Sequence, residues 1–248
     1  MTARTGLVLF GDVVGSRRDS LGSTAWLREL VAELDAAYGT DRLAPFGFTQ
    51  GDELQGLLAP PADPLAAVLR AALGPAGRRM RWAFVTGPVD EDATGIAPAT
   101  ERTGPAFVAA RDAIGEARAG HERLVIRTGR PDVDSLLADF APALMDMLDG
   151  LTERQRTVAR MALLEDLRQS EVADRLHVRR ATISVSFNRA RVRPLQGLVA
   201  GIRRIYSEGS PDPRSGETVA AEPGVAAAAE AGEASAAVAT RAGRGVAS

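Results

Sequence analysis

Cysteine is absent from this chain, and histidine occurs only as His121 and His177. Cys-His catalysis, zinc knuckles and iron–sulfur clusters all depend on these residues, so the three classes are excluded together. Any metal ion must therefore be bound by oxygen atoms. The sequence also has no uncharged apolar stretch of about 18 residues and no N-terminal signal segment. We therefore expect a soluble, cytoplasmic protein without a membrane partner.

Lysine is absent as well, so all 30 basic residues are arginines, and they are unevenly distributed. Residues 1–150 carry a net charge of −6, residues 151–206 carry +7 and residues 207–248 carry −3. A compact basic block between acidic segments is typical of a nucleic-acid-binding module attached to another domain. Genome composition explains the choice of arginine over lysine but does not explain this clustering.

The first 130 residues alternate between strand-like and helix-like patterns. Apolar strand patterns cover residues 6–14, 46–49, 54–58, 81–86 and 124–128. Helical spacing of apolar residues covers 23–38, 65–73 and 106–119. This βαββαβαβ order predicts an α+β fold, with a ferredoxin-like sheet, its helices on one face, and an added helix and strand.

The rest of the chain divides further. Residues 131–150 are predicted to form a connecting helix, and residues 151–206 form helices without strand signals. From residue 207 to residue 248 the composition is dominated by alanine, glycine, serine, proline and glutamate, which predicts a disordered tail. The expected units are therefore 1–130, 131–150, 151–206 and 207–248.

Two aspartates lie where strand patterns end. Asp12 follows the first strand, and Asp52 lies in the turn of a predicted hairpin. Because the first strand of a βαββαβ sheet lies beside that hairpin, the two carboxylates face each other and repel unless a cation lies between them. Oxygen ligands near phosphate favour Mg²⁺. The alternative is that both aspartates only cap strands or turns of a domain without a ligand.

The loop after Asp12 offers the groups that a triphosphate needs. It supplies accessible backbone N–H groups, a hydroxyl and two guanidinium groups, from Val13, Val14, Gly15, Ser16, Arg17 and Arg18.

Three segments carry a family resemblance: Phe-Gly-Asp-Val-Val-Gly-Ser at 10–16, Thr-Gln-Gly-Asp-Glu-Leu-Gln-Gly-Leu at 49–57 and Gly-Pro-Ala-Phe-Val-Ala-Ala-Arg at 104–111. Together they resemble the SatD family of bacterial proteins and, more distantly, class III nucleotidyl cyclase domains, over roughly residues 6–128. The resemblance implies Mg²⁺ bound by Asp12, Asp52 and the carbonyl of Val13. It also implies a purine nucleoside triphosphate, ATP or GTP, held by Val13, Val14, Gly15, Ser16, Arg17 and Arg111.

The chain departs from the cyclase pattern at two positions. Phe48 stands where the cyclases have a base-recognising lysine, and Phe107 or Val108 stands where they have an asparagine. None of these side chains can hydrogen-bond a base or a ribose. Stabilisation of transition-state charge would depend on metal ions and arginines alone, which favours nucleotide binding without turnover over catalysis.

The basic segment has the signals of a helix-turn-helix. Thr152 and Gln155 form a predicted capping box, and Ser170 is expected to cap a second, short helix. A turn at 177–179 follows, in which His177 is interpreted as a turn residue rather than a metal ligand, and a third helix is expected over 180–191. The pattern at 176–184 resembles region 4 of sigma factors.

The third helix is predicted to read DNA in the major groove. With Ile183 and Phe187 at i, i+4 facing the core, the small Ala181 lies on the outer face, and the predicted DNA-binding residues are Arg179, Arg180, Thr182, Ser184, Val185, Asn188 and Arg189. Phosphate contacts are expected from Arg191, Arg193, Arg203 and Arg204. The alternative is that these arginines form the solvated face of a dimerisation module.

Three functions are compatible with these patterns. The first is a transcription regulator that binds a Mg-nucleotide without turnover and binds double-stranded DNA as a homodimer. The second is an enzyme, a metal-dependent nucleotidyl cyclase or nucleotidyl transferase that its helix-turn-helix localises on DNA. The third is a constitutive DNA-binding protein whose N-terminal domain dimerises. The missing lysine and asparagine favour a protein that is not an enzyme.

Overall fold

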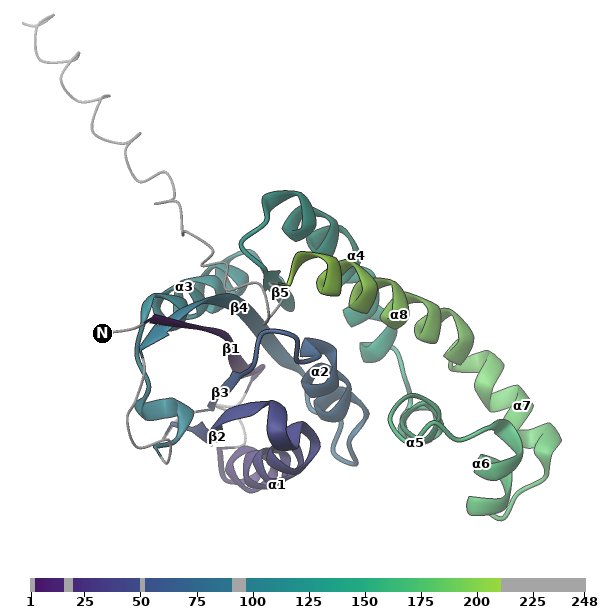
Figure 1. Ribbon diagram of the computed structural model, residues 1–248. Helices are drawn as coiled ribbons and strands as arrows, with labels where there is room; N and C mark the ends of the chain where they lie inside the picture. The colour runs from purple at the N-terminus through teal and green to yellow at the C-terminus, as the bar shows by residue number, and fades with distance from the viewer. Residues whose placement is uncertain (1–2, 16–19, 50–51, 91–96, 211–248) are drawn as a thin grey trace, which may run out of the picture.

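A sheet domain followed by a helical domain forms the part of the chain that the computed structural model describes, residues 3–15, 20–49, 52–90 and 97–210 (Figure 1). The strands are β1 (Ala3–Val13), β2 (Arg42–Phe48), β3 (Glu53–Leu58), β4 (Met80–Asp90) and β5 (Leu124–Arg127). The α-helices are α1 (Ser20–Tyr38), α2 (Pro64–Leu73), α3 (Pro105–Ala119), α4 (Pro131–Asp149), α5 (Glu153–Leu163), α6 (Gln169–Arg175), α7 (Arg180–Arg189) and α8 (Val192–Gly209). Two short 3-10 helices, η2 (Gly39–Asp41) and η3 (Ala99–Glu101), complete the order.

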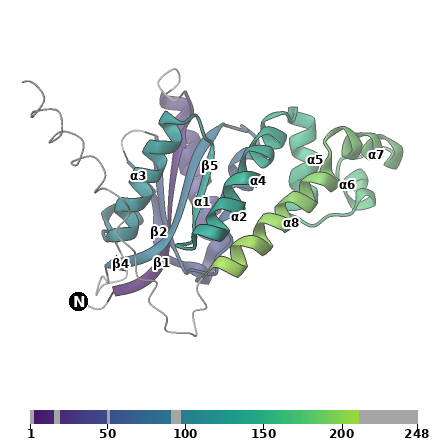
Figure 2. The same cartoon turned by 90° about the horizontal axis from the view of Figure 1, so that it is seen from above.

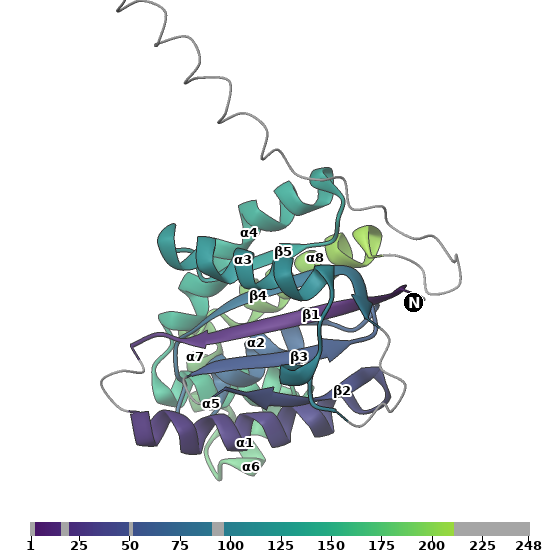
Figure 3. The same ribbon diagram turned by 90° about the vertical axis from the view of Figure 1, so that its left-hand side faces the viewer.

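The five strands form one sheet in the order β2-β3-β1-β4-β5 (Figure 3). The central strand β1 is antiparallel to both β3 and β4, and β5 is parallel to β4. Leu7 lies opposite Leu58, and Asp12 lies opposite Glu53. The predicted α+β fold is therefore confirmed, including the position of the first strand beside the hairpin.

Both faces of β1 are buried. Leu7 and Leu9 belong to the hydrophobic cluster that contains α1 and α2, whereas Val8 and Phe10 pack in a second cluster with α3. The prediction of helices on one face holds for α1 and α2, whereas α3 lies on the opposite face (Figure 2). The cause is the continuous apolar run of β1, which does not alternate with polar residues and so needs a cover on both sides.

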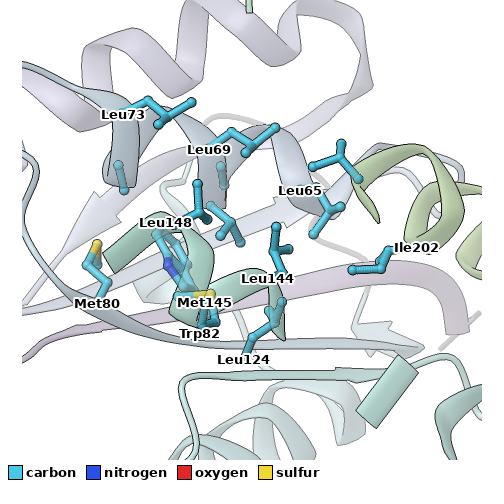
Figure 4. Packing of buried hydrophobic residues seen from close by; sticks show 14 of the residues in the cluster. Leu65, Leu69, Leu73, Met80, Trp82, Leu124, Leu144, Met145, Leu148 and Ile202 are labelled. Atoms are coloured by element: carbon cyan, nitrogen blue, oxygen red, sulfur yellow. The ribbon is translucent and has the colours of Figure 1, made fainter. Parts of the chain in front are cut away.

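The larger cluster runs without interruption from the sheet into the C-terminal helices. Figure 4 shows Trp82 of the sheet close to Leu148 of α4, with Leu65 of α2 and Ile202 of α8 nearby. Each buried leucine or isoleucine contributes about 1.5–3 kcal/mol by leaving water. The predicted connecting helix at residues 131–150 is therefore present as α4, and its apolar face is part of the hydrophobic core.

The C-terminal end of α8 is fixed on the loop before α2. The Arg203 guanidinium pairs with the Asp63 carboxylate at 2.6 Å, so this arginine, expected at a phosphate, is used inside the fold. The hydroxyl of Tyr206 donates to the carbonyl oxygen of Pro60 at 2.8 Å, and burial raises the pKa of Tyr206 to about 12. Residues 207–209, expected in the tail, are helical because Gly209 packs closely against Val133.

None of the helices in the described ranges is long and apolar enough to cross a lipid bilayer.

Asp149 joins the end of α4 to the sheet and predicts a pH dependence of stability. Its carboxylate accepts hydrogen bonds from Arg79 and Arg123. Burial opposes ionisation, but these two bonds outweigh it and hold the pKa of Asp149 below its ordinary value. We expect Asp149→Asn to lower the free energy of unfolding at neutral pH by about 1–3 kcal/mol.

The sign of this effect sets its pH window. A carboxylate with a depressed pKa in the folded state stabilises above the unfolded pKa of about 3.9, and the stabilisation is lost as the pH falls through the folded pKa. Urea unfolding at pH 7, 4 and 3 should therefore show a difference between wild type and Asp149→Asn that is nearly the same at pH 7 and 4 and shrinks at pH 3. A difference independent of pH would contradict the role of the Asp149 charge. The exposed Glu29→Gln serves as the matched control.

Candidate functional site

Asp12 lies at the C-terminal end of β1 and is almost completely buried, with 4% of its surface exposed. Its two carboxylate oxygens are each paired with an arginine: Oδ2 with Arg81 of β4 at 3.0 Å, and Oδ1 with Arg118 of α3 at 2.9 Å. Arg81 lies directly opposite Asp12 in the β1–β4 register. In the fold as it stands, guanidinium groups supply the positive charge that a buried carboxylate needs.

The predicted partner, Asp52, directly precedes β3. The backbone N–H of Val13 donates to the carbonyl oxygen of Asp52 at 3.3 Å, so the two segments meet as the topology predicted. Residues 50–51 of the hairpin turn lie outside the described residues. The neighbouring Glu53 accepts a hydrogen bond from the buried Gln55 at 2.8 Å on the same side of the sheet as Asp12.

The predicted phosphate loop begins with a turn. The N–H of Val14 donates to the carbonyl of Arg79 at 2.9 Å. Gly15 has a φ of +79°, which glycine adopts at little cost. Ser16 and Arg17, the other predicted nucleotide contacts, lie outside the residues that the structure describes, as does Arg18.

Arg111 lies two turns before Arg118 on α3, toward the N-terminal end of that helix, and Arg118 is the residue that contacts Asp12. Its guanidinium carbon is 5.7 Å from the centre of the Phe10 ring, a cation–π arrangement. Arg111 also lines an open cavity of about 380 Å³, together with Gln55 and the N-terminal turn of α3 with Phe107 and Val108. Phe107 and Val108, one of which stands where the cyclases have an asparagine, therefore give this cavity an apolar wall.

Two residues at Asp12 were missed by the sequence reasoning. Arg118 is seven residues after Arg111, two turns along the same face of α3, so helical periodicity would have identified it. Arg81 had no comparable signal because its position depends on the register between β1 and β4. When two strands are neighbours in the sheet but far apart in the sequence, the residues that face each other can be identified only once the strand order and register are known.

The basic segment folds from strong local signals. The Thr152 hydroxyl accepts from the N–H of Gln155, and the Gln155 side chain accepts from the N–H of Thr152, which confirms the predicted capping box at the start of α5. The second short helix begins at Gln169, so Ser170 is inside α6 and does not cap it. The Glu171 carboxylate instead accepts the N–H of Arg168 at 2.6 Å.

The turn between α6 and α7 has the close approach that a helix-turn-helix requires. The N–H of Val178 donates to the carbonyl of the buried Ala173 at 3.0 Å. His177 is exposed with a φ of +52°, in agreement with its interpretation as a turn residue. Ile183 and Phe187 are buried and hold α7 to the core, and α7 ends at Arg189, two residues before the predicted end.

The outer face of α7 is accessible. The predicted DNA-binding residues lie as follows: Arg179, Arg180, Thr182, Val185, Asn188 and Arg189 are exposed, and Ser184 is half-buried. Val185 is 50% exposed. Among the described residues, no acidic side chain pairs with the arginines of this face. Figure 1 shows α6 and α7 at the end of the molecule furthest from the sheet.

Residues 142–193 match the family described as Sigma-70, region 4. The match covers about a fifth of the chain, from the second half of α4 to the first residues of α8. No curated protein matches the chain. The C-terminal part therefore carries a helix-turn-helix of the sigma-70 region 4 kind, which suggests that it binds DNA.

Proposed function

We propose that this protein is a nucleotide-responsive transcription regulator that binds double-stranded DNA through α7. The observation that carries the proposal is the exposed face of α7 in a helix-turn-helix, where arginine, asparagine and valine side chains form no ion pair with an acidic side chain of the described part of the chain. Arginine can bind guanine, asparagine can bind adenine, and valine can contact a thymine methyl group.

The surrounding charge favours this use of the face. Residues 151–206 carry a net charge of +7, so the helical domain attracts a polyanion over several phosphates. Arg191, Arg193 and Arg204 are exposed and would contact the backbone, which positions α7 without reading the sequence. We expect two copies to bind one operator because a two-fold operator needs two recognition helices.

The proposed ligand of the sheet domain is a Mg-bound purine triphosphate at the end of β1. Asp12, Asp52 and the carbonyl of Val13 would hold Mg²⁺, which neutralises phosphate charge when bound. Each Asp12 oxygen accepts one arginine and keeps a further lone pair. Arg118 is 57% exposed on the surface and is able to transfer from Asp12 to a phosphate, whereas Arg81 stays on its strand.

Two partly exposed ion pairs join the C-terminal helices to α1 and to the start of α2. Arg160 of α5 pairs with Glu33 of α1 at 2.7 Å, and Arg203 of α8 pairs with Asp63 at the start of α2. The helical domain is therefore attached to the sheet domain by packing and by charge. A ligand that shifts the sheet domain would change the position of α7, which supports regulation of DNA binding by the nucleotide.

The test is a titration of a labelled DNA duplex with the full chain. Affinity should fall about 100-fold or more between 50 and 200 mM salt, the loss expected when four or more phosphates are neutralised. Adding Mg-ATP or Mg-GTP should change the affinity at constant ionic strength. Absence of DNA binding at 50 mM salt would disprove the DNA-binding function. Binding that neither nucleotide changes would leave a constitutive DNA-binding protein.

A further inference from the structure

Helix α4 exposes an apolar stripe, defined here as Leu136, Phe140, Ala143 and Met147. Leu136 is 47% exposed and Phe140 is 41% exposed, although both are large apolar side chains. Ala143 is exposed, and Met147 is half-buried. The intervals of four, three and four residues place all four side chains on one line, the spacing by which helices pack knobs into holes. The adjacent face of α4, with Leu137, Leu144 and Leu148, forms the core.

Acidic side chains flank the stripe. Residues 131–150 contain five aspartates and no basic residue, in a chain with 30 arginines. Exposed aspartates occur at seven-residue intervals, at Asp132, Asp139 and Asp146. Each is three or four residues from a member of the stripe, so the row runs beside it on the helix surface.

The charge of this row is compensated only in part within the fold, since Asp146 interacts electrostatically with Arg79 without forming an ion pair. Asp132 pairs with Arg130 on the surface at 2.7 Å. Asp139 and Asp146 make no ion pair with another described residue. At the Met147 end, a cavity of about 240 Å³ is also lined by Arg189 and Arg191, so the acidic surface extends as far as Asp146 and ends there.

We infer that the stripe is the docking site of a basic amphipathic helix from a partner protein. Such a helix buries its apolar face on Leu136 and Phe140, while its arginine or lysine side chains meet Asp139 and Asp146. Contiguous exposed apolar surface with charge on one flank is typical of protein interaction sites. The stripe lies on a different helix from the proposed recognition helix α7, and its Met147 end borders the cavity that Arg189 and Arg191 line.

Charge argues against the other occupants. In a two-fold antiparallel pair of α4 helices the aspartate row of one copy would face the same row of the other, and like charges repel. The chain's own residues 207–248 carry a net charge of −3 and would be repelled as well. A basic helix from another protein is the complementary partner.

The probe is a synthetic peptide with leucine at positions a and d of a heptad and arginine at the flanking positions, labelled for fluorescence anisotropy. The control peptide has glutamate in place of arginine. The full chain should bind the arginine peptide and not the glutamate peptide. Phe140→Ser should weaken binding of the arginine peptide about tenfold or more. Asp139→Arg should reverse the preference between the two peptides.

Leu21→Ser is the matched control, since Leu21 is 86% exposed at the far end of the sheet domain and should leave binding unchanged. Unchanged melting temperatures establish that each variant is folded. Equal binding of both peptides, or no effect of Phe140→Ser, overturns the inference. Sedimentation of the chain alone provides a second test: self-association that Phe140→Ser abolishes would make the stripe a dimer interface and would also overturn it.

Discussion

Reversing the charge of Arg180 should weaken DNA binding about 100-fold or more at moderate salt, because a guanidinium at the start of the recognition helix is replaced by a carboxylate facing phosphates and base edges. Arg180 is exposed and makes no ion pair with a described residue, so Arg180→Glu leaves the fold intact. Anisotropy titration with a labelled duplex measures the loss. Arg28→Glu, the same charge change on the exposed side of α1, should cost far less.

Two further variants separate reading of sequence from attraction to phosphate. Asn188→Ala should cost roughly 1–3 kcal/mol on a selected site and little on a random duplex, because it removes a base contact. Arg204→Ala should weaken all duplexes alike and reduce the salt dependence. If Arg180→Glu binds as well as wild type, α7 is not the recognition helix, even if the chain binds DNA by another surface.

Asp12→Asn should destabilise the protein and abolish its response to nucleotide. Loss of the carboxylate charge leaves the Arg81 guanidinium, which is only 19% exposed, without its counter-charge. We expect a loss of about 1–3 kcal/mol in the free energy of unfolding, because Arg118 can turn toward solvent while Arg81 cannot. Melting curves without ligand measure this loss, with Glu29→Gln as a control for an exposed carboxylate.

The nucleotide response is measured on the same samples. Wild type should melt at higher temperature with Mg-ATP or Mg-GTP, whereas Asp12→Asn and Asp52→Asn should melt at the same temperature with and without them. If both variants keep the full shift, the proposed metal site does not exist. If Asp12→Asn lowers the melting temperature without ligand, and wild type shows no shift with either nucleotide, Asp12 has a structural role only.

The fold follows from signals that are local in the sequence. Apolar runs, caps and glycine stops predict the strands, the hairpin and the capping box, because each depends on neighbours within a few residues. Helix α3 covers the second face of the sheet because that face is apolar as well. The unbroken apolar run from Leu7 to Phe10 already indicates two buried faces. The predicted end of α8 is three residues too early because the composition changes at residue 207, whereas the helix continues to Gly209, which lies close to Val133.

The candidate sites also differ in how far they depend on residues close together in the sequence. The helix-turn-helix and its outer face follow from spacing within 30 residues, so their residues could be assigned from sequence. The pairing of Asp12 with Arg81 could not, because Arg81 lies 69 positions away and its place depends on the strand register. Arg118, 106 positions away, is within reach of sequence reasoning only through its helical spacing from Arg111. Arg203 shows the reverse error: an arginine in a basic block was assigned to DNA, whereas it binds Asp63 from 140 positions away.

If the proposed function holds, helix α8 would transmit movements of the sheet to the DNA-binding helix-turn-helix. Two residues, Ala190 and Arg191, separate α7 from the first residue of α8. The last turns of α8 are fixed by Tyr206 and Arg203 to the loop before α2. Eighteen helical residues span about 27 Å, so a tilt of about 10° at the sheet end moves the other end by about 5 Å. This displacement exceeds the rise of one base pair, about 3.4 Å. Small movements beside α2 would therefore set the spacing between two recognition helices, and with it which operators a pair of molecules can span.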